Sequence, residues 1–162
     1  MTTPPEIKES LIEIYDANWD TANVAKPLDI KTESFSEVYP DGITLPAMTI
    51  PTTTENSVGE TGYAAMSNSG PVQQKVGQAQ VNLWITKEAA HDLGTYDDNI
   101  ISPEGWLDRA RKEAGRITRQ KVILLPGYDY IAWDSGQDRH EKDRQPVIFR
   151  RMSFVKYSYK TR

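Results

Sequence analysis

The chain has 162 residues and a formal net charge of −4, and 38% of its residues are hydrophobic, a low share for a globular domain. Because it contains no cysteine, disulfides, thiolate metal sites and cysteine nucleophiles are excluded. The N-terminus is polar, and no run approaches the ~18 apolar residues that a membrane span needs. These features predict one domain covering residues 1–162, made in the cytoplasm and not bound to a membrane.

Charge is divided by position along the chain. Residues 1–105 hold sixteen acidic and five basic side chains, a net of −11, whereas residues 106–162 hold seven acidic and fourteen basic side chains, a net of +7. A surface with two such poles is suited to contact with copies of itself or with a charged partner. The pI of about 5.2 argues against general nucleic-acid binding, although the basic C-terminal third allows a local form of it.

A helix is the first element expected in chain order, from Thr3 to Asn18. Thr3 is expected to cap it, Pro4 suits its first turn, and Glu6 completes a capping box three residues after the cap. One face is expected to be buried, formed by the apolar residues that recur at helical spacing: Ile7, Leu11, Ile14 and Tyr15.

Residues 21–51 are expected to form short extended pieces, because four prolines rule out a long helix. The sequence Tyr-Pro-Asp-Gly at 39–42 predicts a tight turn. Residues 43–45 and 48–50 are expected to be strand segments, which the neighbouring prolines would confine to a sheet edge or a kink.

Residues 52–74 are the least core-like stretch, rich in Thr, Ser, Asn and Gly, and their few apolar residues show no period. A loop of this length without secondary structure is uncommon in a compact domain and is usually functional. A plain surface loop and a protruding arm ordered by a neighbour both fit. The arm is favoured, because ordering so long a loop without contacts in return would cost much conformational entropy.

The rest of the chain predicts a sheet and a second main helix. The elements expected in order are a strand over 76–85, a short helix over 86–94, a loop over 96–101, a helix over 102–120, a turn at 126–127, and strands over 128–133 and 147–159 joined by the charged loop 134–145. The apolar residues of the last strand change parity, which predicts a bulge or strong twist near Arg150 and Arg151. The order indicates an α+β fold, with a mostly antiparallel sheet packed against two main helices and a long extended loop or arm.

The charged loop holds the densest set of possible metal ligands. They are Asp134, Asp138, His140, Glu141 and Asp143. Because three basic residues are interleaved with them and the spacing matches no calcium loop, a solvated hairpin tip is favoured over a cation site. The two histidines, His91 and His140, stand in no hydrolase pattern, and phosphate-binding glycine motifs are missing. We therefore predict that the protein is not an enzyme and has no catalytic residue, metal or cofactor.

Basic residues gather on the second main helix and on the last strand. They are Arg109, Arg111, Lys112, Arg116 and Arg119 on the helix, and Arg150, Arg151, Lys156, Lys160 and Arg162 on or after the strand, with Tyr157 and Tyr159 interleaved. Three interpretations stay open. The set fits a nucleic-acid surface of cations and stacking rings, a solvated helix face with a guarded edge strand, or a contact with the acidic half of a neighbouring copy. The contact between copies is favoured.

The element order and length resemble those of tail terminator and related head–tail connector proteins of tailed viruses. The residues that carry the resemblance are the helix 3–18, the strand 80–85 (Gln-Val-Asn-Leu-Trp-Ile), the helix 102–120 and the closing strand 146–159. Two features depart from it, since the segment 52–74 is longer than a simple hairpin loop and the last hairpin has an unusually charged tip.

The resemblance implies a small α+β subunit of the virion that assembles as a ring, typically a homohexamer. The ring would sit at the junction of head and tail, cap the tail tube, contact other neck and tail-tube proteins, and let DNA pass through its lumen. No residue would be catalytic. The interface residues expected on this basis are Arg109, Arg116, Arg150, Arg151, Tyr157 and Tyr159.

Two other functions remain as alternatives. The first is a small nucleic-acid-binding accessory protein that uses the basic C-terminal third, and salt-dependent binding to DNA would favour it. The second is a hydrolase that uses the acidic cluster of loop 134–145, and stabilisation by a divalent metal would be its signature.

Overall fold

The structure is a computed structural model that describes residues 6–34, 42–58, 65–67, 70–96, 99–121 and 125–161. Its helices are α1 (Ile7–Asn18), α3 (Lys87–Asp92) and α4 (Pro103–Lys121). Its strands are β1 (Asp29–Lys31), β2 (Ala47–Thr49), β3 (Thr53–Val58), β4 (Ala65–Ser67), β5 (Gly70–Ile85), β6 (Thr95–Tyr96), β7 (Asn99–Ile100), β8 (Tyr130–Asp138) and β9 (Phe149–Thr161).

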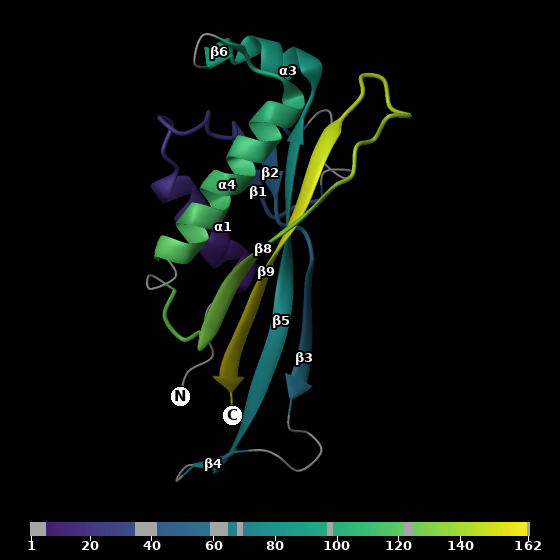
Figure 1. Cartoon of the computed structure of the whole chain (residues 1–162). Coiled ribbons are helices and arrows are strands. Elements are labelled where there is room, and N and C mark those ends of the chain that lie inside the picture. The colour runs from purple at the N-terminus through teal and green to yellow at the C-terminus, as the bar shows by residue number, and fades with distance from the viewer. Residues whose placement is uncertain are drawn as a thin grey trace.

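In the described part of the chain, the main sheet has seven strands. Its path is β1-β2-β5-β9-β8, and β3 and β4 each pair with β5 as well. The pair β1–β2 is parallel, and the pairs that β5 makes with β2, β3, β4 and β9 are antiparallel, as is β8–β9. Both α1 and α4 pack on one side of this sheet (Figure 1). The predicted α+β fold, with a mostly antiparallel sheet against two main helices, is confirmed.

Strand β5 shows how the core forms. Its residues Val81, Leu83 and Ile85 have no exposed surface and belong to the main apolar cluster, together with the buried faces of α1 and α4. Since successive side chains of a strand point to opposite faces, the even-numbered residues of β5 lie on the face away from the helices. We call these two sides the covered face and the uncovered face.

The two main helices are held to each other and to the loop between α1 and β1. The Tyr15 hydroxyl and the Thr118 hydroxyl lie 2.8 Å apart in the core, and burial raises the pKa of Tyr15. The indole of Trp106 donates to the Ala25 carbonyl at 3.1 Å. Residues 19–25 are thereby fixed against α4.

Helix α1 buries the expected face, but its start differs from the prediction. Ile7, Leu11, Ile14 and Tyr15 are buried, and the helix ends at Asn18 as expected. It begins at Ile7, and Glu6 stands outside it in an extended conformation without a side-chain cap bond, so the capping-box prediction is wrong. Thr3 and Pro4 lie outside the described residues. Ile7 is the first buried residue in the described part of the chain, so packing accounts for a helix that starts there.

Helices α3 and α4 follow their local signals. The Thr86 hydroxyl accepts from the Ala89 amide at 3.2 Å, and Gly94 follows α3 with a φ of 85°, which favours glycine. The Ser102 hydroxyl accepts from the Gly105 amide at 3.0 Å at the start of α4. The turn at 126–127 is also present, with Gly127 at a φ of 92°.

The segment between β2 and β5 is more ordered than predicted. Residues 53–58 and 65–67 are strands that pair with β5, so the prediction of a stretch without secondary structure is wrong for them. The ends of β3 and β5, with β4, extend beyond α1 and α4 (Figure 1). We call this extension, residues 53–58, 65–67 and 70–78, the arm.

Three smaller predictions also need correction. Residues 43–45 form no strand, and β2 lies between β1 and β5 rather than at an edge, because Pro46 and Pro51 flank the strand without occupying it. Residues 95–96 and 99–100, expected in a loop, pair as β6 and β7. The turn expected at 39–42 lies largely outside the described residues.

The bulge predicted in the last strand is absent, whereas nothing tests the strong twist that was its alternative. Strand β9 pairs with β5 in continuous register from Phe149 to Thr161, so no bulge interrupts it at 150–151. The irregularity lies in β8, between Asp134 and Gln137. Parity changes because Ile148 is buried in a second apolar cluster on the uncovered face, whereas Val155 and Tyr157 belong to the main core.

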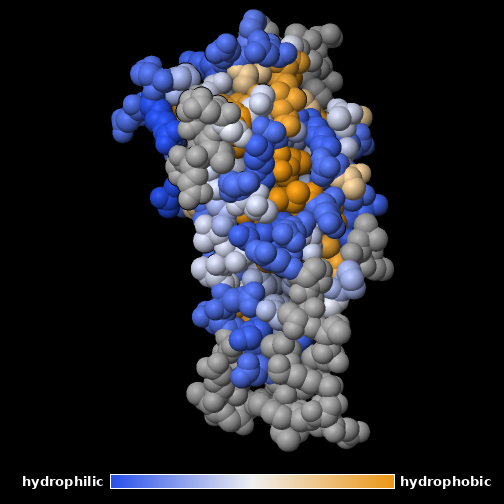
Figure 2. Space-filling view, turned by 180° about the vertical axis from the view of Figure 1, so that it is seen from behind, coloured by the Kyte–Doolittle hydropathy of each residue, from blue (hydrophilic) through white to orange (hydrophobic). Residues whose placement is uncertain are grey.

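Seen from behind, the surface is mostly hydrophilic, and hydrophobic residues show as a band in its upper half (Figure 2). The second apolar cluster, on the uncovered face, consists of Ile43, Ala47, Trp84 and Ile148. The sheet therefore has a large core on its covered face and a small one at one end of its uncovered face.

Candidate interaction surfaces

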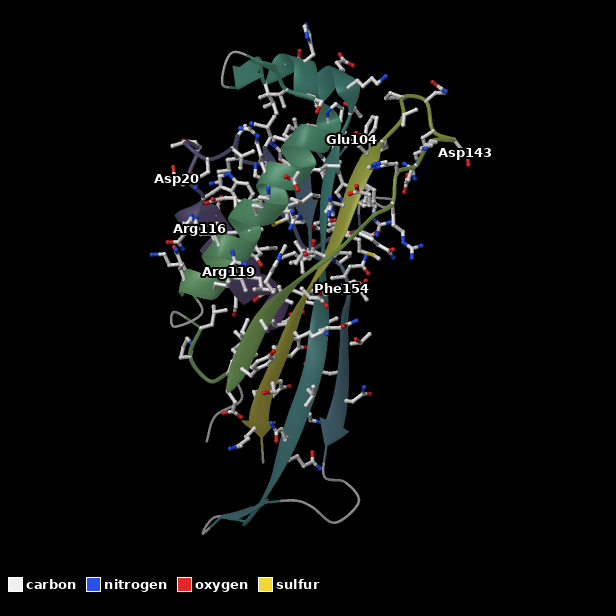
Figure 3. All side chains as sticks on the ribbon, viewed as in Figure 1. Asp20, Glu104, Arg116, Arg119, Asp143 and Phe154 are labelled. Atoms are coloured by element: carbon white, nitrogen blue, oxygen red, sulfur yellow. The ribbon has the colours of Figure 1, made fainter. Side chains whose placement is uncertain are left out.

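The basic face of α4 lies next to the loop that follows α1. A groove of about 270 Å³ is lined there by Asn23, Arg109, Lys112, Glu113 and Arg116. In Figure 3, Arg116 and Asp20 lie close together on this side, and Arg119 lies further along the helix. The predicted residues Arg109 and Arg116 are thus brought together on one helix face.

Arg116 is bound within the subunit. Its guanidinium pairs with the Glu113 carboxylate and donates to the Gln120 side chain at 2.8 Å and to the Asn18 carbonyl at 3.1 Å. Hydrogen bonding to Glu113 raises its pKa. Arg116 therefore joins α4 to the end of α1, and the cations beside it, Lys112 and Arg119, are more exposed.

Glu113 was missed by the sequence analysis. It is 2% exposed, and its carboxylate accepts from the Asp20 amide at 3.0 Å, from the Asn23 side chain at 2.7 Å and from Arg116. Burial alone would raise its pKa, but these hydrogen bonds outweigh burial and lower it. In the sequence, a glutamate among arginines indicates a solvated helix face. Glu113 is buried only because residues 19–23 fold over its side chain.

Arg150 and Arg151 lie on opposite faces of the sheet, because they are consecutive residues of β9. Arg150 donates to the Asn82 side-chain oxygen at 3.1 and 2.9 Å and stacks 4.6 Å from the centre of the Trp84 ring. Arg151 pairs with Asp138 at 2.5 Å. Reversing both charges would therefore disturb these internal contacts.

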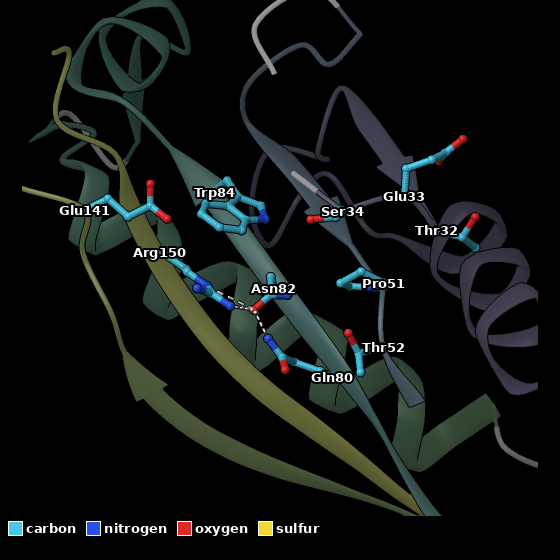
Figure 4. Close-up of a pocket in the computed structure, with 10 residues that line it drawn as sticks. All are labelled: Thr32, Glu33, Ser34, Pro51, Thr52, Gln80, Asn82, Trp84, Glu141 and Arg150. Carbon is cyan, nitrogen blue, oxygen red and sulfur yellow. Dashed lines mark hydrogen bonds between the residues drawn. The ribbon is translucent and has the colours of Figure 1, made fainter. Parts of the chain in front are cut away.

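A polar groove lies beside Arg150 on the uncovered face (Figure 4). Its volume is about 420 Å³. Its lining residues are Thr32, Glu33, Ser34, Pro51, Thr52, Gln80, Asn82, Trp84, Glu141 and Arg150. Burial lowers the pKa of Arg150, and the Glu141 carboxylate opposes this. With one guanidinium, two carboxylates and several hydroxyl and amide groups, the groove presents mixed charge and many hydrogen-bonding partners.

Tyr157 and Tyr159 meet one carboxylate in the arm. The Tyr157 and Tyr159 hydroxyls each donate to Glu55 at 2.7 Å, and the Tyr128 ring packs edge-on against both rings at 5.8 Å. Burial, reinforced by Glu55, raises the pKa of Tyr157 and raises that of Tyr159 to about 12. The Tyr157 ring crosses Gly77, where a Cβ would lie 2.7 Å from ring atoms. The two tyrosines thus hold β3 to the sheet.

Three acidic residues expected in the charged loop 134–145 pair with cations of the same chain, and two of them, Asp134 and Asp138, lie in β8 rather than in a loop. Asp134 pairs with Lys156 at 3.4 Å and Glu141 with Arg144 at 2.6 Å. His140 accepts from the Arg150 amide at 3.1 Å and packs against Phe149. Among the described residues, no group of three or more histidine or carboxylate side chains is placed to hold a metal ion.

Within the described ranges, no helix is both long and apolar enough to cross a membrane. No protein-family model matches the chain, and no curated protein sequence matches it. The candidate surfaces are therefore interpreted from their own geometry and chemistry: a basic helix face on α4, a polar groove on the uncovered face, and an arm fastened by two tyrosines.

Proposed function

We propose that the chain is a structural virion protein of a tailed virus. In this proposal it forms a homo-oligomeric ring at the head–tail junction, as a tail terminator or connector that joins the tail tube to the neck. Its partners are copies of itself and other neck and tail-tube proteins, and DNA passes through the lumen only as cargo. The protein then resides in the virion.

The arm is the observation that carries the proposal. Strands β3 and β5 extend past the helical layer, and Glu55, Tyr157 and Tyr159 fasten β3 to the sheet. Two of the three large apolar side chains that are exposed within the described residues lie on the arm or beside it, Val76 of the arm at 42% and Tyr130 of β8 at 55%. They line one groove of about 440 Å³ on the uncovered face. An ordered extension with exposed apolar residues suits contact with a neighbouring ring or subunit.

The placement of charge supports the same function. The exposed acids Glu9, Glu13 and Asp16 lie on α1, and the exposed cations Lys112 and Arg119 lie on α4. One subunit therefore presents both signs, which favours a repeated contact of unlike surfaces between copies.

Light scattering of the purified protein over a concentration series, at low and high salt, tests the proposal. A discrete species with the mass of a closed ring, weakened by salt, is the expected result. Negative-stain images of that species should show a central opening. A monomer at every concentration and salt would count against it. Strongly salt-dependent binding of the monomer to DNA would favour the alternative, a nucleic-acid-binding accessory protein.

A further inference from the structure

The solvent side of α1 carries a short row of acidic residues. Glu9, Glu13 and Asp16 are exposed and are spaced by four and three residues, so they line one side of the helix over about 10 Å. Asp16 pairs with Lys26 at 2.6 Å. Within the described part of the chain, Glu9 and Glu13 make no ion pair at all, so their charges are available to a partner.

A groove of about 410 Å³ opens beside this row, between α1 and β1. Three carboxylates line it, from Glu9, Glu13 and Glu33, together with one cation, Lys31, and the half-buried side chains of Ile12 and Ile30, so acids outnumber the cation. Apolar surface flanked by carboxylates fits a long basic side chain, because the methylene stem packs on the isoleucines while the charged end meets the acids. We call this groove the acidic groove.

Helix α4 presents side chains of that kind. Lys112 and Arg119 are exposed and seven residues apart, which equals the spacing between Glu9 and Asp16 on α1. Arg119 makes no ion pair among the described residues, and Lys112 pairs with the exposed Asp108. The two helices thus carry rows of opposite charge with the same two-turn spacing.

The two rows lie toward different edges of the sheet. Helix α1 packs beside β1, which is one edge strand, and α4 packs against β8, which is the other. Gly115 of α4 lies directly against the Trp133 ring of β8. A contact between α1 of one copy and α4 of another therefore joins unlike surfaces, and each copy keeps a second surface for the next.

We propose that the acidic groove binds the exposed basic side chains of α4, Arg119 and Lys112, from a second copy of this chain. The proposal rests on the proposed function in taking another copy as the partner, and it names the two surfaces that meet. Charge complementarity and the matched spacing select this occupant.

Reciprocal charge reversal tests this contact. One variant carries Glu9→Lys and Glu13→Lys, and the other carries Lys112→Glu and Arg119→Glu. Each alone should associate at least about tenfold more weakly than the unmodified protein, because like charges would face each other. An equimolar mixture should recover association, since every contact between unlike variants then joins opposite charges. Mass by light scattering is the readout, and circular dichroism checks that each variant is folded.

The matched control changes charge by the same amount elsewhere. Glu88→Lys with Asp92→Lys alters two exposed acids on α3, and this variant should associate like the unmodified protein. The proposed contact is wrong if the α1 and α4 variants associate as the unmodified protein does, or if their mixture does not recover association. Neither result contradicts the proposal of a ring. Recovery in a dimer or open filament would uphold the contact and contradict the ring. An unmodified protein that stays monomeric would contradict both.

Discussion

The covered and uncovered faces of the sheet are built from the same two long strands, yet they are stabilised by different means. On the covered face, Val81, Leu83 and Val155 are fully buried under α1 and α4. On the uncovered face, Asn82 is 1% exposed without a helix above it, because Arg150 and Gln80 bond to it and Trp84 lies alongside.

The difference teaches that burial in this sheet has two sources. The covered face gains the hydrophobic stabilisation of a contiguous core, which grows with the apolar area removed from water. Beyond its small apolar cluster, the uncovered face depends on hydrogen bonds and a cation–π contact, whose net contributions are smaller because water competes for the same groups. Substitutions on the two faces should therefore differ in their effect on stability.

The largest effect is expected for Leu83→Ala on the covered face. Leu83 has no exposed surface, so the change removes buried methyl groups and leaves a cavity. The free energy of unfolding should fall by about 3 kcal/mol. Urea denaturation followed by tryptophan fluorescence measures it. Gln78→Ala, in the same strand on the uncovered face, is the control and should change stability by less than about 0.5 kcal/mol. Equal losses would refute the distinction between the faces.

Glu113→Gln replaces the buried carboxylate of α4 with a neutral amide. The free energy of unfolding should fall by about 2 kcal/mol. Because the folded protein lowers the pKa of Glu113, its carboxylate stabilises the fold above the ordinary glutamate range, and this stabilisation is lost as pH falls through the lowered value. The variant should accordingly lose less stability than the unmodified protein when urea denaturation is repeated at falling pH.

Asp108→Asn is the matched control for that experiment. Asp108 also pairs with cations one turn away on α4, but its side chain is 42% exposed. Its loss should cost below about 1 kcal/mol, as for other surface ion pairs. If the two variants lost equal stability, the buried hydrogen bonds of Glu113 would contribute no more than the partly exposed ion pairs of Asp108.

A smaller effect is expected for Tyr157→Phe at the arm. This change removes one of the two hydroxyls that donate to the Glu55 carboxylate. About 1 kcal/mol of stability should be lost. In a spectrophotometric titration, Tyr159 and Tyr128 should ionise near pH 12, since burial raises both pKa values to about 12 and Glu55 adds to the effect. Glu55→Gln should move these titrations to lower pH. Tyr130→Phe, at an exposed position, is the control and should leave stability unchanged.

Local signals explain what the sequence predicted well. Thr86 and Ser102 cap their helices through their own hydroxyls, and the buried face of α1 follows from helical spacing. Alternation likewise identified the buried residues of β5. In each case neighbours along the chain decide the structure, so a single sequence carries the information.

Non-local pairing explains what the sequence did not reveal. Residues 53–57 are polar and show no alternation, and with Val58 they become β3 only because β5 returns beside them. Glu113 looks solvated until residues 19–23 fold over it. Treating Arg150 and Arg151 as parts of one surface overlooked strand alternation, which separates them even without a structure. Of the six candidate interface residues, Arg109 and Arg116 share one surface, and Tyr157 and Tyr159 share another.

The smallest effect is expected for Arg150→Lys on the uncovered face. Lysine keeps the charge but cannot direct two donors to the Asn82 oxygen or stack as a plane on Trp84. Gln80 still donates to Asn82 at 3.0 Å, so the buried amide keeps a partner and the loss should be only about 0.5 to 1 kcal/mol. The exposed Arg139→Lys is the control in urea denaturation. A loss as large as that of Leu83→Ala would mean that this polar contact, rather than the apolar core, determines how firmly the two strands are held.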